Sequence, residues 1–231
     1  MGGVDLIAEQ MPQRTTRYWV ETKKRCTDLH LTIVSLSPSN NFGRTRPAER
    51  QVEVENVKRW IDAAFVLGAP CVRIFAGWPP AGQARVFWPK MVQCMRAVAT
   101  HAAQAGITLV VEPHNHGGFV SNVRSALRLL RQVDTPWIKL NLDTGGYIEK
   151  SPEALYAAFE TSLPYAPHVV AKMHDVHPAK EPLDYDRIVA MLARRGYHGF
   201  VTVEYEGEAD EMTAVPKAVA LLRQYARTHA L

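Results

Sequence analysis

Acidic side chains follow short apolar runs at regular intervals along this sequence. Glu112 comes after Thr-Leu-Val-Val, Asp143 after Lys-Leu-Asn-Leu, and Glu204 after Val-Thr-Val. His174 follows a fourth run, which ends at Met173. Neighbouring members of this series are about 30 residues apart, which is the length of one strand–helix unit of a parallel sheet. Because the carboxyl ends of such strands converge on one face, we expect the four side chains to meet there.

Three carboxylates and one imidazole form a ligand set that suits a divalent cation. The sequence predicts one bound ion held by Glu112, Asp143, His174 and Glu204, with Mn²⁺ as first choice and Mg²⁺, Co²⁺ or Zn²⁺ as alternatives. Crowding this much negative charge at one face is costly unless a cation neutralises it. A single acidic residue after a strand is more often a helix cap or a solvated loop residue, and Glu206 is interpreted in that way.

Other polar residues are expected at the same face. The loop Pro-His-Asn-His-Gly-Gly follows the first of these carboxylates directly. Its residues His114, Asn115 and His116 are candidates for contact with substrate, although a loop histidine that binds only backbone groups is an equally good interpretation. His168 and His177 are interpreted as ordinary residues of the rim.

Two basic residues lie within predicted strands. Lys172 shares strand parity with His174 and is expected to point inward, where a lysine is rare unless it is paired or catalytic. The alternative for Lys172 is a salt bridge to Asp143 or Glu204. Arg73, in Cys-Val-Arg-Ile-Phe, is an unusual charge for a buried strand and is a candidate for binding a substrate oxygen.

Short β-branched and apolar runs alternate with longer stretches of helical period, as in strand–helix units around a parallel sheet. The predicted strands are Val4–Glu9, Leu31–Leu36, Cys71–Phe75, Thr108–Glu112, Ile138–Asp143, His168–Met173 and Phe200–Glu204. Helices are predicted over Glu49–Leu67, Trp88–Ala105, Ser121–Gln132 with a serine cap, a stretch that starts at Ser151, Asp184–Arg195 and Ala214–Ala226.

This alternation predicts an α/β fold, a (β/α)8 TIM barrel formed as a single domain by residues 1–231. Such a barrel has eight strands, whereas seven are predicted here, so the barrel is expected to lack its first strand at the N-terminus. An open parallel edge is a liability for a folded protein. Pairing with a second copy, as a homodimer, is therefore a further expectation.

Composition narrows the partners that are expected. The net charge is +4, and the basic residues are scattered, without the aromatic-interleaved stripe of nucleic-acid binders. Three cysteines without a close pair favour a reducing, cytoplasmic setting. No apolar run approaches the ~18 residues of a membrane span. A small molecule is the expected partner, rather than nucleic acid or a membrane.

Several motifs together resemble the xylose isomerase-like TIM-barrel family, the sugar phosphate isomerase/epimerase group. The matching segments cover nearly the whole chain. They are Thr32-Ile-Val-Ser-Leu-Ser-Pro-Ser-Asn, Leu67-Gly-Ala-Pro-Cys-Val-Arg-Ile-Phe, Val-Val-Glu112-Pro-His-Asn-His-Gly-Gly, Leu-Asn-Leu-Asp143-Thr-Gly-Gly and Gly199-Phe-Val-Thr-Val-Glu204-Tyr-Glu.

The resemblance implies roles for particular residues. In that family a glutamate, an aspartate, a histidine and a final glutamate bind one divalent metal, and the two glutamates act as acid and base. Carried over, this implies Glu112, Asp143 and Glu204. The family's usual His-x-Lys run aligns with Val170-Ala171-Lys172, which places valine at the histidine position, so His174 is the substitute ligand. Where the family often has a histidine after the aspartate, this chain has Gly145-Gly146.

The function implied is a metal-dependent isomerase or epimerase that removes a proton alpha to the carbonyl of an unphosphorylated sugar and forms an enediolate. A metal-dependent lyase, such as a dehydratase or keto-glycoside eliminase on a sugar or cyclitol, shares this first step. A non-catalytic sugar-binding barrel is a third hypothesis. A nuclease resembling endonuclease IV would need more histidine ligands and a basic groove, neither of which is evident.

Overall fold

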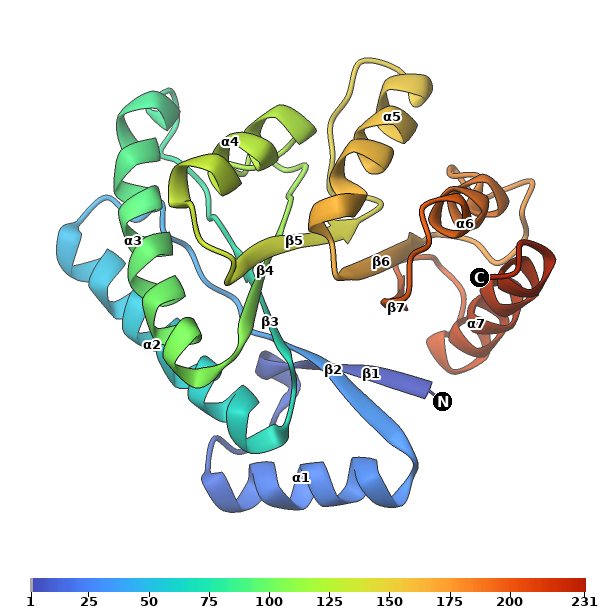
Figure 1. Ribbon diagram of the computed structural model, residues 1–231, viewed down its shortest axis with the longest axis horizontal. Helices are drawn as coiled ribbons and strands as arrows, with labels where there is room; N and C mark the ends of the chain where they lie inside the picture. Colours follow the sequence, from blue (N-terminus) through green and yellow to red (C-terminus); the bar gives the residue numbers. More distant parts are fainter. Residues whose placement is uncertain (1) are drawn as a thin grey trace.

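Strands and helices alternate throughout residues 2–231, the part of the chain that this computed structural model describes (Figure 1). Seven strands form one sheet in chain order, and each neighbouring pair is parallel. The predicted strands are confirmed to within two residues at each end; the first is shifted because Ala8–Gln10 form a 3-10 turn. The strands are β1 (Gly2–Ile7), β2 (Leu31–Ser37), β3 (Cys71–Phe75), β4 (Thr108–Glu112), β5 (Ile138–Asp143), β6 (His168–Met173) and β7 (Phe200–Tyr205).

A helix follows each strand, and the helices surround the sheet in Figure 1. One of them, Thr16–Asp28, is absent from the prediction. It buries Cys26 and leaves most of its other side chains exposed, so it lacks a clear apolar stripe. The helices are α1 (Thr16–Asp28), α2 (Pro47–Leu67), α3 (Ala84–Ala105), α4 (Val123–Val133), α5 (Pro152–Ser162), α6 (Tyr185–Arg194) and α7 (Glu211–Thr228).

Helix ends follow ordinary capping chemistry. The predicted serine cap at Ser121 is wrong, because the side chain of Asn122 caps α4 by accepting a hydrogen bond from the Ser125 N–H at 2.9 Å. Ser151 caps α5 as predicted, accepting from the Ala154 N–H at 3.2 Å. Gly68 follows α2 with φ of 77°, a left-handed conformation in which glycine is favoured.

The core explains why the strand signals were readable. Leu109, Val110 and Val111 of β4 are completely buried, since one face of the strand meets the barrel interior and the other meets the helices. On the helix side, Trp60 of α2 and Met95 of α3 are buried in the same hydrophobic core cluster as residues of β4. Burying a side chain such as that of Met95 contributes about 1.5–3 kcal/mol to folding.

The first and last strands meet without a backbone ladder within the described residues. The Thr202 hydroxyl of β7 donates to Asp5 Oδ2 of β1 at 2.9 Å. The Phe200 ring of β7 covers Gly3 of β1, where a Cβ would come within 2.8 Å of the ring. Seven parallel strands therefore form a nearly closed barrel, and the predicted TIM-barrel fold with seven strands is confirmed. None of the described helices combines the length and apolar character that crossing a membrane requires.

Candidate active site

The carboxyl ends of the strands bring most of the predicted polar residues to one mouth of the barrel. Glu112 ends β4 and Asp143 ends β5, and both are buried. Lys172 of β6 lies opposite Glu204 of β7 in the strand register. A cavity of about 690 Å³ opens here and continues along the seam between β1 and β7 toward α7. Its polar lining includes Asp5, Arg73, Glu112, Asn141, Glu204 and Glu206.

The Lys172 ammonium lies among three carboxylates. Its Nζ is 3.3 Å from Asp143 Oδ2, 3.4 Å from Glu204 Oε2 and 3.1 Å from Glu206 Oε1. Burial lowers the pKa of Lys172, but these negative charges outweigh burial and raise it above the ordinary value. Lys172 is therefore a permanent cation, and the salt bridges considered for it in the sequence are present.

The backbone around Lys172 is fixed by two hydroxyl groups. The Lys172 N–H donates to Thr144 Oγ1 at 3.0 Å, and the Tyr185 hydroxyl donates to the Lys172 carbonyl at 2.5 Å. These two hydroxyls also share a hydrogen bond of 2.9 Å. Gly145 leaves room for the lysine stem, because a Cβ at this position would lie 2.5 Å from Lys172 Cδ.

The two buried carboxylates are held in different ways. Glu112 Oε2 accepts a hydrogen bond from Asn141 Nδ2 at 2.7 Å and lies 3.5 Å from Arg73 Nε. Asp143 Oδ1 accepts from the Gly145 N–H at 2.9 Å. Burial raises the pKa of Glu112, against the opposing charge of Arg73. Burial and the neighbouring Glu112 raise the pKa of Asp143 to about 7. Groups tuned in this way can exchange protons near neutral pH.

An aromatic wall stands beside this cluster. The Trp78 and His114 rings lie edge to face, with centroids 4.9 Å apart, and Phe75 lies 5.4 Å from each of them. The Arg73 guanidinium lies over Phe75 at 4.4 Å. Burial lowers the pKa of His114, so the neutral imidazole is favoured. Such a wall can pack against the apolar face of a sugar ring.

The rest of the predicted loop lies farther out. His116 is exposed, and its ring centroid is 5.2 Å from that of His114. Its backbone N–H donates to His114 Nδ1 at 3.2 Å, so one loop histidine does bind a backbone group. Asn115 is half-buried. Contact between these residues and a substrate stays a prediction.

The structure does not bring His174 to the carboxylates. Its side chain is exposed, because β6 ends at Met173 and the chain turns away from the barrel there. Glu181 Oε2 fixes that turn by accepting hydrogen bonds from the N–H groups of His174 at 2.7 Å and Asp175 at 2.8 Å. Strand parity alone therefore overestimated how far the inward-facing run extends.

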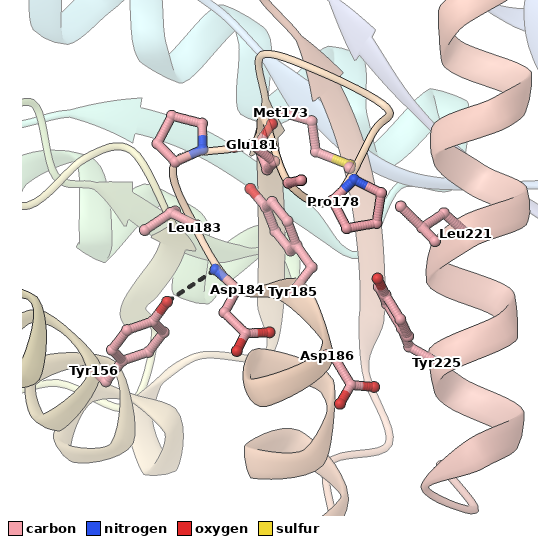
Figure 2. A pocket seen from close by; sticks show the side chains of 12 residues that line it. Tyr156, Met173, Pro178, Glu181, Leu183, Asp184, Tyr185, Asp186, Leu221 and Tyr225 are labelled. Atoms are coloured by element: carbon pink, nitrogen blue, oxygen red, sulfur yellow. Dashed lines mark hydrogen bonds between the residues drawn. The ribbon is translucent and has the colours of Figure 1, made fainter.

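The turn that carries His174 covers a second cavity, of about 670 Å³, shown in Figure 2. Tyr185 and Met173 line it on the barrel side, and Leu221 and Tyr225 of α7 line it opposite. The Tyr156 hydroxyl accepts a hydrogen bond from the Asp184 N–H at 2.9 Å, which is the dashed line in Figure 2. None of the predicted catalytic or metal-binding residues lines this cavity.

The family follows from comparison of the whole chain with known sequences. The sequence profile described as "Xylose isomerase-like TIM barrel" matches residues 2–225. The chain belongs to this family. The expectation from the motifs is thereby confirmed for the family, while the reaction is a separate question.

Solved structures share the fold of this xylose isomerase-like chain. D-psicose 3-epimerase with D-tagatose, from Clostridium cellulolyticum H10, is 18% identical, with a TM-score of 0.81, 99% of this chain covered and 89% of that one. L-ribulose 3-epimerase is also 18% identical, with a TM-score of 0.82 and coverages of 100% and 86%. A probable 3-DHS dehydratase involved in petrobactin synthesis, from Bacillus anthracis, is 19% identical, with a TM-score of 0.75 and coverages of 96% and 88%. At these identities the likeness establishes the fold.

The donor set of this xylose isomerase-like chain does not fit the divalent ion that the resemblance implies. Among the described residues, no three histidine, cysteine or acidic side chains are grouped so that they could hold a metal ion. Asp143 and Glu204 approach a common point, but the Lys172 ammonium stands there. Val170, at the family's histidine position, is buried and apolar. A second cation close to this ammonium would be strongly repelled.

Sequence reasoning missed one contact and two contributions to the interior. Glu206 is solvent-exposed as interpreted, and the feature that was missed is its contact with Lys172. Asn141 binds Glu112, and a polar residue two positions before Asp143 in a buried strand was a signal for it. His168 is buried rather than on the rim, with Nε2 2.9 Å from Thr202 Oγ1.

Proposed function

We propose that this chain is a carbohydrate isomerase or epimerase that transfers a proton next to a carbonyl group. The observation that carries the proposal is Glu112, a buried carboxyl group of raised pKa that lines the mouth cavity beside the cationic Arg73. A carboxyl group in such a setting suits a general base. The sugar class is supported by the family and by the epimerases that share the fold.

In the proposed reaction Glu112 takes the proton from the carbon alpha to the carbonyl. In this proposal Glu204, on β7, enters the reaction protonated, gives that proton to the other face of the carbon and so inverts it, and is left as a carboxylate beside Lys172. Arg73 Nη1 is buried without a hydrogen-bond partner in the described structure, so it has a donor left for a substrate oxygen. Charge that develops on the enediolate oxygen is stabilised by cations already in place.

Substrate contacts beyond the reacting carbon are assigned to the aromatic wall and its loop. His114 and Trp78 pack against the sugar ring, and Asn115 and His116 bind its hydroxyl groups. Lys172 binds a substrate oxygen at the centre of the carboxylate cluster. The divalent ion predicted from the sequence has no part in these steps, because the donor set does not fit it. A homodimer and a cytoplasmic location stay predictions from the sequence.

Three products are possible after the same first step. Return of the proton to the other face of the same carbon gives an epimer, whereas an aldose forms when the proton is taken from C1 of a 2-ketose and returned to C2. Loss of a beta leaving group gives a lyase product. A lyase is the second candidate function, and the dehydratase that shares the fold supports it. Only product analysis separates these outcomes.

The test is conversion of unphosphorylated ketoses, including D-fructose, D-tagatose, D-psicose and L-ribulose, followed by carbon NMR. We expect an epimer or an aldose from at least one sugar. The rate should fall about 10³-fold in Glu112→Gln, as for loss of a general base. Elimination products would replace the isomerase by a lyase. A sugar that binds by calorimetry, with no conversion of any in the panel, would indicate a binding barrel instead.

A further inference from the structure

Each of the two buried carboxylates at the mouth has a cation of its own. Glu112 lies 3.5 Å from the Arg73 guanidinium, and Asp143 lies 3.3 Å from the Lys172 ammonium. The other two carboxylates that contact Lys172 are half-exposed and can be solvated. Buried charge is tolerated when it is paired. Within the described residues, side chains of the chain itself therefore balance the buried negative charge.

The path of the lysine stem depends on a glycine. A Cβ on Gly145 would lie 2.5 Å from Lys172 Cδ, which is closer than carbon atoms approach without a shift, and 3.3 Å from Cγ, which is a tight contact. Gly145 also donates its N–H to Asp143 Oδ1 at 2.9 Å, so the same residue orients the carboxylate that the ammonium contacts. Gly145 therefore makes room for the Lys172 side chain and also orients the carboxylate that this side chain contacts.

The backbone of Lys172 is also fixed by hydrogen bonds. Thr144 and Tyr185 bind its N–H and its carbonyl, as described above, and both hydroxyl groups are buried. Its side chain is 18% exposed, against 3% for Asp143 and 45% for Glu204. The ammonium therefore sits between the buried Asp143 and the more exposed Glu204, which lines the mouth cavity, and part of the lysine side chain stays accessible.

We propose that the Lys172 ammonium is a built-in cation, which takes the position expected for a divalent ion and binds a substrate oxygen there. The substrate part rests on the proposed function, whereas the cation part does not. As Glu112 takes the alpha proton, the C–H electron pair passes into the enediolate and negative charge grows on the carbonyl oxygen. The ammonium exchanges its contact with the half-exposed Glu204 for that oxygen, and no oxidant or second substrate is needed.

The test is a titration of the full chain with Mn²⁺ alone, in which electron paramagnetic resonance counts the free ion. We expect the wild type to leave Mn²⁺ free. Lys172→His should bind about one ion per chain, at least about tenfold more tightly, because it replaces a cation by a ligand between two carboxylates. Lys217→His, the same change at an exposed position of α7, should behave as the wild type.

Gly145→Ala is a second variant, which keeps the lysine and displaces its stem. It should also raise Mn²⁺ affinity, and it keeps the inference testable should Lys172→His fail to fold, which circular dichroism checks. Wild-type binding of one ion per chain as tightly as in Lys172→His would overturn the inference. So would unchanged affinity in both folded variants. The titration contains no sugar, so failure to convert any ketose would refute the proposed function and leave this result standing.

Discussion

Two cavities of nearly equal size differ in what their charged residues do. In the cavity of about 670 Å³ beneath the β6–α6 turn, the acidic groups hold the fold (Figure 2). Glu181 binds two backbone N–H groups, Asp184 caps α6 by accepting from the Arg187 N–H at 3.0 Å, and Asp186 pairs with His229 at 2.9 Å. These carboxylates have structural partners already.

The mouth cavity of about 690 Å³ is lined by more buried polar atoms that lack a hydrogen-bond partner. Within the described residues, buried atoms without a hydrogen-bond partner include Asp5 Oδ1, Arg73 Nη1 and Asn141 Oδ1, all from residues that line it. The second cavity has one such atom, Glu181 Oε1. Unsatisfied buried groups are costly to a fold unless a ligand or water meets them. The buried polar atoms without a hydrogen-bond partner, rather than the cavity volume, therefore identify the mouth as the candidate active site.

The largest contrast is expected from one neutral isostere in each cavity. Glu112→Gln should lower kcat/KM for a converted ketose by about 10³-fold, because the base is lost while its volume is kept. Asp186→Asn, in the second cavity, should change kcat/KM less than about twofold, as surface substitutions away from a site usually do. Steady-state kinetics of both variants measure this. Similar losses in the two would remove the distinction between the cavities.

A stability effect is expected at the base of the mouth cavity. Burial raises the pKa of Asp5 to about 6 from an ordinary value of 3.8. A raised carboxyl pKa favours folding below the unfolded value, and this contribution is lost as pH rises through the folded value. Asp5→Asn, which cannot ionise, should therefore gain about 2–3 kcal/mol over the wild type between pH 4 and pH 7.5.

Urea unfolding at these two pH values measures the gain from Asp5→Asn. Glu208→Gln, at an exposed position between β7 and α7, is the control and should show no comparable change with pH. A gain that is the same at both pH values would mean that Asp5 does not titrate in the native state over this range. The interior of the barrel would then be more polar than its burial indicates.

The smallest effect is expected in the second cavity. Glu181→Gln should destabilise the fold by about 1 kcal/mol, because a charged acceptor of two backbone N–H groups becomes a neutral one. Thermal unfolding measures the loss, and kcat/KM should stay within twofold of the wild type. A large loss of activity at full stability would place Glu181 in the site and contradict its structural role.

The strands and the carboxylates at their ends could be predicted from the sequence, because their signals are local. Strands buried on both faces give continuous apolar runs, and carboxylates at their ends must converge. The helix at Thr16–Asp28 gave no such signal, since it buries so little. Lys172 and His174 share parity, and only the position of the turn after Met173 decides which remains inside. The space that Gly145 leaves is occupied by the side chain of Lys172, 27 positions away in the sequence, and no local pattern reveals this contact.

The most direct test of proton transfer at the mouth is solvent deuterium exchange. The full chain is incubated in D₂O with each ketose that binds, and proton NMR follows the signal of the hydrogen on the carbon next to the carbonyl. We expect deuterium to enter this position with the wild type and about 10³-fold more slowly with Glu112→Gln. A bound ketose that keeps its proton with the wild type, or exchanges equally fast with Glu112→Gln, would show that Glu112 is not the base.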